Sequence, residues 1–110
     1  MAMEQISIAD FKKIDLRIAE IAAVREHPNA DKLIVLTIRV GEEEKQIVAG
    51  IKAFYPMDEL VGRKIVVVNN LEPALLRGEP SQGMLLATRD GDMLSLLTPD
   101  KDIASGSPVS

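Results

Sequence analysis

The sequence predicts an all-β domain with short helices: a five-stranded Greek-key barrel of the OB type, with an N-terminal helix and a C-terminal extension. Residues 32–40 place Ile34, Leu36, Ile38 and Val40 on one face and Leu33, Val35, Thr37 and Arg39 on the other, which is typical of a strand with one apolar face. Residues 65–68 form an uninterrupted β-branched run between turn-forming residues, which indicates a second core strand. Residues 56–61 carry a helix signal between the third and fourth expected strands, and this element order is that of a small OB barrel.

The N-terminal segment predicts a short helix. Ser7 can serve as its N-cap, and Ile8, Phe11 and Ile14 follow at helical spacing. A minimal barrel has no evident place for this apolar stripe. We therefore expect it to lie in an interface between two copies of the chain.

Two interpretations of residues 15–25 remain open from the pattern. Apolar periodicity by itself favours one helix over residues 8–25. The alternative is a helix to about residue 13 and then a long strand with Leu16 and Ile18 facing inward. The apolar alternation then changes from even to odd positions, at Ile21 and Ala23, and the extra residue of a β-bulge would account for the change. We choose the strand because the order of the later elements requires one.

The next elements are a turn, a hairpin and a short helix. Residues 27–31 contain the proline, asparagine and aspartate of a turn. The strand that follows is expected to point four side chains to one face: Ile34, Leu36, Ile38 and Val40. Residues 41–44 form the hairpin connection and 46–49 the returning strand. The helix over 56–61 would end at Gly62.

A long polar loop then separates two core strands. The run 65–68 is expected to be buried on both faces, and the loop over 71–80 contains two prolines and a glycine. The apolar run 85–87, a hairpin at Asp90-Gly91 and a strand over 93–97 follow. Long loops in compact domains are usually functional, so the sequence predicts a binding surface here.

Composition excludes several classes of protein. With 110 residues the chain is one domain, residues 1–110, and no apolar run is long enough to cross a membrane. With no cysteine and one histidine, a thiolate nucleophile or a zinc site is not available, and no Gly-rich phosphate loop appears. We expect a cytoplasmic protein that is not an enzyme and holds no metal or cofactor. The net charge of −4 means that any polyanion must be met by a local basic patch.

Several motifs together resemble the tRNA-binding domain family, which is found at the C-terminus of bacterial methionyl-tRNA synthetase and as a stand-alone protein. The resemblance covers residues 8–109. Its motifs are Asp15-Leu16-Arg17-Ile18, His27-Pro28-Asn29-Ala30-Asp31-Lys32-Leu33, Val48-Ala49-Gly50-Ile51, Val68-Asn69-Asn70-Leu71-Glu72-Pro73 and Gly78-Glu79-Pro80-Ser81-Gln82-Gly83-Met84-Leu85-Leu86-Ala87.

The resemblance implies a homodimer that binds tRNA by shape, acting as a tRNA chaperone or as a cofactor of an aminoacyl-tRNA synthetase. Residues 1–14 and 98–110 would make the dimer, with Ile8, Phe11 and Ile14 in its interface. The serine and methionine with which the family contacts tRNA would correspond to Ser81 and Met84. The expected tRNA-binding residues are Lys32, Arg39, Gln46, Asn70, Arg77, Ser81, Gln82 and Met84.

The residue types fit recognition of folded RNA. The only aromatic residues are Phe11, Phe54 and Tyr55, too few for base stacking to be the main source of affinity. Lysine and arginine side chains suit phosphates, whereas Ser81 and Gln82 suit a ribose 2′-hydroxyl or a base edge. The alternative function is peptide binding like that of the secretion chaperone CsaA, which resembles this family. An exposed apolar groove would favour that alternative.

Overall fold

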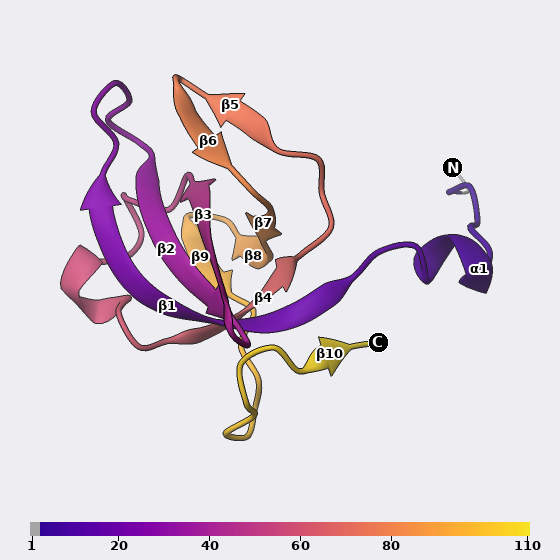
Figure 1. Cartoon of the computed structure of the whole chain (residues 1–110). Helices are drawn as coiled ribbons and strands as arrows, with labels where there is room; N and C mark the ends of the chain where they lie inside the picture. The colour runs from indigo at the N-terminus through magenta and orange to yellow at the C-terminus, as the bar shows by residue number, and fades with distance from the viewer. Residues whose placement is uncertain (1–2) are drawn as a thin grey trace.

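The computed structural model describes residues 3–110 and consists mainly of β-strands (Figure 1). Five antiparallel strands pair in the order β3-β2-β1-β4-β7, and β10 pairs with β1. The five-strand path corresponds to the five predicted strands, and its curled sheet confirms the all-β fold of OB-like type. The elements in chain order are α1 Ile8–Phe11, β1 Leu16–Glu26, β2 Ile34–Val40, β3 Glu43–Ala49, a 3₁₀ helix Met57–Glu59, β4 Lys64–Val68, β5 Ala74–Leu76, β6 Glu79–Ser81, β7 Met84–Leu85, β8 Ala87–Asp90, β9 Met93–Leu96 and β10 Pro108–Val109.

Strand β1 decides between the two interpretations of residues 15–25. It pairs with β2 in a register that shifts between Ile21 and Ala23, so the predicted bulge is confirmed. Of the four side chains expected to face inward, Ile18 and Ile21 are buried and Leu16 is half-buried, whereas Ala23 is exposed, so the expectation is wrong for Ala23. Ala19 and Ile21 join the core cluster, whereas Ile18 is buried outside it. The Ile18 backbone pairs with Gly106 and Ser107, so the C-terminal segment lies along β1 beside it.

The core lies mainly between β2, β3 and β4. The four predicted inward residues of β2 are all buried in the core cluster: Ile34, Leu36, Ile38 and Val40. Ile47 and Ala49 of β3 face them, as the register of an antiparallel pair requires. Strand β4 differs from the prediction, since Ile65 and Val67 are buried while Val66 and Val68 are half-buried. Because successive side chains of a strand point to opposite faces, β4 presents only one face to the core.

The predicted loop over 71–80 contains a β-hairpin instead. Strands β5 and β6 pair from Ala74↔Ser81 to Leu76↔Glu79. Arg77 and Gly78 connect them with φ of 54° and 95°. Positive φ at both residues is typical of the type I′ turn, whose twist matches a hairpin. An arginine at the first of these positions is uncommon, which is why the pattern did not predict the hairpin.

The two chain ends differ in their relation to the barrel. The Ser7 hydroxyl accepts a hydrogen bond from the Asp10 backbone at 3.0 Å, so the predicted N-cap is confirmed. Figure 1 shows α1 lying away from the sheet, and Ile8 and Ile14 are exposed. Residues 1 and 2 of the predicted interface element lie outside the described residues. The other end, β10, pairs with β1 of its own chain.

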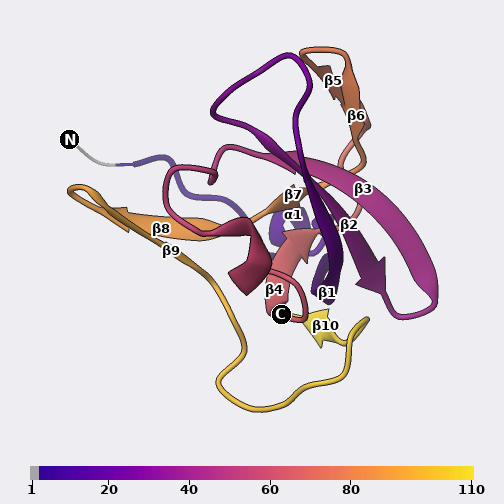
Figure 2. The same ribbon diagram turned by 90° about the vertical axis from the view of Figure 1, so that its left-hand side faces the viewer.

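A second hairpin projects from the barrel (Figure 2). It consists of β8 and β9, which pair from Ala87↔Leu96 to Asp90↔Met93, so the predicted turn at Asp90-Gly91 is confirmed. Met93 near its tip is largely exposed. Among residues 3–110, no helix has the length and apolar character needed to cross a bilayer.

Candidate nucleic-acid interface

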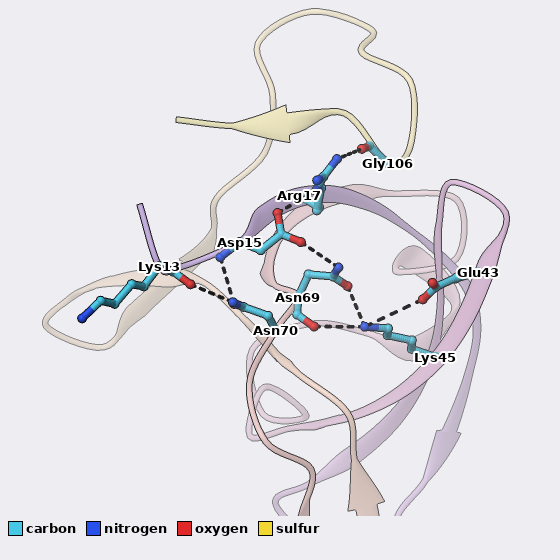
Figure 3. A network of polar contacts seen from close by, with 8 residues as sticks. All are labelled: Lys13, Asp15, Arg17, Glu43, Lys45, Asn69, Asn70 and Gly106. Atoms are coloured by element: carbon cyan, nitrogen blue, oxygen red, sulfur yellow. Dashed lines mark hydrogen bonds and ion pairs between the residues drawn. The ribbon is translucent and has the colours of Figure 1, made fainter. Parts of the chain in front are cut away.

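A polar network ties the start of β1 to the end of β4 (Figure 3). The Asn69 amide donates to the Asp15 carboxylate at 3.0 Å, and Arg17 donates to it at 2.8 Å. The Lys45 ammonium donates to both the side-chain and backbone oxygens of Asn69. The Asn70 amide bridges the Lys13 carbonyl and the Asp15 backbone N–H. Asn70 was expected to bind RNA, but its side chain instead bonds to the segment that follows α1 and orients it.

This network makes the stability contribution of Asp15 depend on pH. Hydrogen bonds from Asn69, and then from Arg17, lower the pKa of the Asp15 carboxyl below its ordinary 3.8. The carboxylate therefore stabilises the fold above pH 3.8, and this contribution is lost as the pH falls below 3.8 through the lower folded-state pKa. In urea unfolding from pH 7 to 2.5, the stability difference between wild type and Asp15→Asn should shrink over that range. Asp92→Asn, at an exposed turn, controls for the loss of one carboxylate, and a difference that stays constant for Asp15→Asn would contradict the prediction.

The turn after β1 and the β5–β6 hairpin meet through reciprocal hydrogen bonds. The Asn29 amide donates to the Arg77 carbonyl, and the Arg77 guanidinium donates to the Asn29 carbonyl, both at 3.3 Å. Between them lies a hollow of about 330 Å³ lined by Asn29, Ala30, Asp31, Lys32, Leu33 and Arg77. Lys32 and Arg77, 45 positions apart in the sequence, are thus brought together. Neither forms an ion pair within residues 3–110.

Three other expected site residues attach the chain after β6 to the edge of β3. The Ser81 hydroxyl accepts from the Val48 N–H and donates to the Gly83 carbonyl, both at 3.0 Å. Gln82 and Gln46 exchange two hydrogen bonds, and the Gln46 amide also donates to the Pro80 carbonyl at 2.9 Å. Ser81 is only 4% exposed. In this arrangement the Ser81 hydroxyl holds the hairpin to the sheet and is not presented to a ligand.

Met84 lies at the surface, beside an apolar groove. The residue is 50% exposed. The groove has a volume of about 230 Å³ and is lined by Val48, Leu71, Glu72, Ala74, Leu76, Ser81, Gly83 and Met84. Leu76 lines this groove while the adjacent Arg77 lines the polar hollow. The β5–β6 hairpin therefore separates this hollow, which we call the cationic hollow after Lys32 and Arg77, from an apolar groove.

Arg39 is not brought to this surface. It lies seven residues after Lys32, about 20 Å along an extended chain, near the opposite end of β2. Its cross-strand neighbours are Glu20 on β1 and Glu44 on β3. Two carboxylates beside it make the local field less favourable for a phosphate.

The structure adds positioning residues that the sequence pattern did not identify as functional. His27 is buried between the turn after β1 and the β5–β6 hairpin. Arg25, at the end of β1, forms an ion pair with Glu79 of β6. Both contacts fasten the hairpin over the end of the sheet. The His27-Pro28 turn was visible in the sequence. Its role was not, because the partner of His27 in the hairpin, Leu76, is 49 positions away.

The side chains of Phe54 and Tyr55 are engaged within the protein. The guanidinium carbon of Arg89 lies 5.1 Å from the centre of the Phe54 ring, and that of Arg63 lies 5.2 Å from the Tyr55 ring centre. Each ring thus has one face covered by an arginine. Within the part of the chain that the structure describes, no group of three or more His, Cys, Asp or Glu residues could hold a metal ion.

Comparison with known proteins shows which family the chain resembles. A family model described as "Putative tRNA binding domain" matches residues 16–108. The chain is 54% identical over 105 residues to the methionine–tRNA ligase of Thermotoga maritima and 50% identical over 107 residues to that of Pyrococcus furiosus. These matches cover 96% and 97% of this chain but only 17% and 15% of the ligases, so the chain spans about a sixth of those relatives.

Two solved structures resemble the whole chain. A methionyl-tRNA synthetase-related protein from Pyrococcus horikoshii matches with a TM-score of 0.91 and 31% identity, covering 98% of this chain and 100% of that one. The CsaA chaperone protein from Picrophilus torridus matches with a TM-score of 0.89 and 33% identity, covering 96% and 100%. With the family model spanning nearly the whole barrel, these likenesses identify the family. The chain belongs to the tRNA-binding domain family.

Proposed function

We propose that this domain binds folded tRNA, with the hollow between the 27–33 turn and the β5–β6 hairpin as its centre. The observation that carries the proposal is the convergence of Lys32 and Arg77 on one hollow, without an acidic ion-pair partner within the described residues. Guanidinium and ammonium groups suit phosphate oxygens. The exposed Met84 and Leu76 beside the hollow offer an apolar surface for a ribose or base.

Recognition by shape fits this surface better than recognition of sequence. Few groups near the hairpin are free to read base edges, because Gln46, Gln82 and Ser81 are bonded within the protein. Folded RNA is read mainly through phosphates and 2′-hydroxyls. We therefore infer binding of many tRNAs with little discrimination, by a module without a catalytic role. A tRNA partner would place the domain in the cytoplasm, as a tRNA chaperone or a cofactor of an aminoacyl-tRNA synthetase.

We further propose that the functional unit is a homodimer. Ile8 and Ile14 are exposed on a segment that lies away from the barrel, and Phe11 between them is only half-buried. A second copy would cover these apolar groups and also double the RNA-binding surface, which helps a chain of net charge −4 hold a polyanion. The C-terminal residues 98–110 remain a proposed part of this interface, although β10 already pairs with β1 of its own chain.

The oligomeric state is measured by sedimentation at micromolar concentration. Wild type should sediment as a dimer, and Ile8→Glu should shift it toward monomer because a charge would enter the apolar contact. Met93→Glu introduces the same charge at an exposed methionine on the β8–β9 hairpin and should leave the dimer intact. A wild-type monomer would refute the dimer.

A CsaA-like peptide-binding function is the second candidate. The apolar groove beside Met84 supports it, together with the exposed side chain of Leu75 on the neighbouring strand β5. Salt-dependent gel shifts with folded tRNA, an unstructured RNA of equal length and an unfolded polypeptide separate the two functions. The tRNA proposal expects tight binding only to folded tRNA. With two phosphates contacted per subunit, by Lys32 and Arg77, log K should fall with log salt with a slope of about −1.8. Preferential binding of the polypeptide would favour the chaperone function.

A further inference from the structure

His27 is the single histidine of the chain and is 6% exposed. Its ring lies between the turn that follows β1 and the β5–β6 hairpin. Nδ1 accepts a hydrogen bond from the Asn29 backbone N–H at 2.9 Å, and Nε2 lies 2.8 Å from the Leu76 carbonyl oxygen. Both ring nitrogens are therefore engaged with the backbone.

These two partners determine the protonation state of the ring. A backbone N–H can only donate, so Nδ1 must present its lone pair. A carbonyl can only accept, so Nε2 must carry the hydrogen. The bonding pattern is complete only for the neutral ring with its hydrogen on Nε2. A proton added at Nδ1 would face the Asn29 N–H and break that hydrogen bond.

The same hydrogen bonds hold the two sides of the cationic hollow. Asn29, whose N–H is bonded to His27, exchanges two hydrogen bonds with Arg77. Leu76, whose carbonyl is bonded to His27, directly precedes Arg77 in the hairpin. His27 thus joins the turn that carries Lys32 to the hairpin that carries Arg77.

The charged groups near the ring are largely paired with one another. Arg25 of β1 pairs with Glu79 of β6, and Glu26 pairs with Lys52. On the remaining packed segments, Asp31, Lys32 and Arg77 line the hollow. Both ring nitrogens are bonded to backbone groups. Among the described residues no carboxylate is bonded to the ring, so none is in place to accept a hydrogen bond from a protonated Nδ1.

We propose that His27 is a positioning residue for RNA binding: its neutral ring clamps the hairpin to the 27–33 turn, and its protonation loosens the hollow. This inference rests on the proposed tRNA binding. The inference predicts an unusual direction for the change of RNA affinity with pH. Added positive charge ordinarily strengthens binding to RNA, whereas here protonation weakens it.

The test measures tRNA affinity at pH 7.5 and 5.5 at constant ionic strength. Loss of one buried hydrogen bond predicts affinity about fivefold weaker at pH 5.5. His27→Gln, which cannot titrate, should change less than about twofold between the two pH values. Wild-type affinity that is unchanged or stronger at pH 5.5, or a His27→Gln variant with the same pH dependence as wild type, would overturn the inference.

A nuclear magnetic resonance titration of the RNA-free, ¹⁵N-labelled protein gives an independent measurement, also should His27→Gln fail to fold. At pH 7.5 the ring should show an unprotonated Nδ1 and a protonated Nε2. On acidification the amide signals of Asn29, Arg77 and Gly78 should shift with the same midpoint as the ring. A ring protonated on Nδ1 at pH 7.5, or one that titrates while these amides stay unchanged, rejects the clamp. If tRNA is bound at neither pH, the proposed function and the RNA half of this inference both fail, and the titration still decides the positioning role.

Discussion

Replacing Lys32 and Arg77 together with alanine is expected to weaken tRNA binding about sixtyfold at 0.1 M salt. Each phosphate contact releases close to 0.9 counterion, which at this salt concentration is worth about eightfold in affinity. Both cations line one hollow, so we expect each to meet a phosphate. The slope of log K against log salt should also become shallower by about 1.8. Filter-binding or gel-shift titrations from 50 to 300 mM salt would measure both quantities.

A charge-matched control separates the local patch from the overall field. Arg39→Ala with Arg89→Ala removes the same two charges away from the hollow: Arg39 near the far end of β2, and Arg89 in the β8–β9 hairpin. Screening at this salt concentration confines their influence to about 10 Å, so affinity should change about twofold. If this control loses as much affinity as the Lys32 and Arg77 variant, the hollow is not the binding site.

Ser81→Ala is expected to lower the free energy of unfolding by about 1 to 3 kcal/mol, although it removes one atom. The Val48 N–H would lose its acceptor, and an unsatisfied buried donor bears its full desolvation cost. Because the same hydroxyl holds the chain after β6 to β3, the β5–β6 hairpin should loosen and tRNA affinity should fall with stability. Urea unfolding monitored by circular dichroism would measure the stability change.

The matched control is Ser95→Ala. Ser95 is exposed and its hydroxyl makes one long hydrogen bond, 3.3 Å, to the adjacent Leu96 carbonyl. Its removal should change stability by less than about 0.5 kcal/mol. A Ser81→Ala variant with wild-type stability but reduced tRNA affinity would contradict the positioning role and indicate direct contact between the hydroxyl and RNA.

Local pattern predicted those parts of the fold in which neighbours in sequence determine the structure. The alternation of β2 placed Ile34, Leu36, Ile38 and Val40 in the core, because a strand repeats every two residues. The phase slip between Ile21 and Ala23 likewise indicated the bulge. The face of Ile18 could not be predicted in this way. It depends on Gly106 and Ser107, nearly 90 positions later, which lie along β1.

For the candidate site, too, the sequence predicted some features and could not predict others. Residue types and motifs identified Lys32, Arg77 and Met84 as candidates for an RNA surface, and the structure leaves these side chains exposed around one hairpin. The same reasoning could not tell that the Ser81 hydroxyl turns inward to the Val48 N–H, or that Arg39 lies between Glu20 and Glu44. Side-chain polarity indicates what a residue can bind, whereas its neighbours in space determine whether those bonds are already made.

By itself, the sequence determined the fold class and the chemical types available for binding, because these follow from composition and from the succession of elements along the chain. Short-range periodicity did not suffice for residues 15–25, where it favoured a helix. Only the tertiary structure decided which of those groups meet. Lys32 and Arg77 converge because a positive-φ turn at Arg77-Gly78 and the buried His27 ring bring two distant segments together. Such contacts depend on closing long loops, and no local pattern in the sequence encodes where a loop will close.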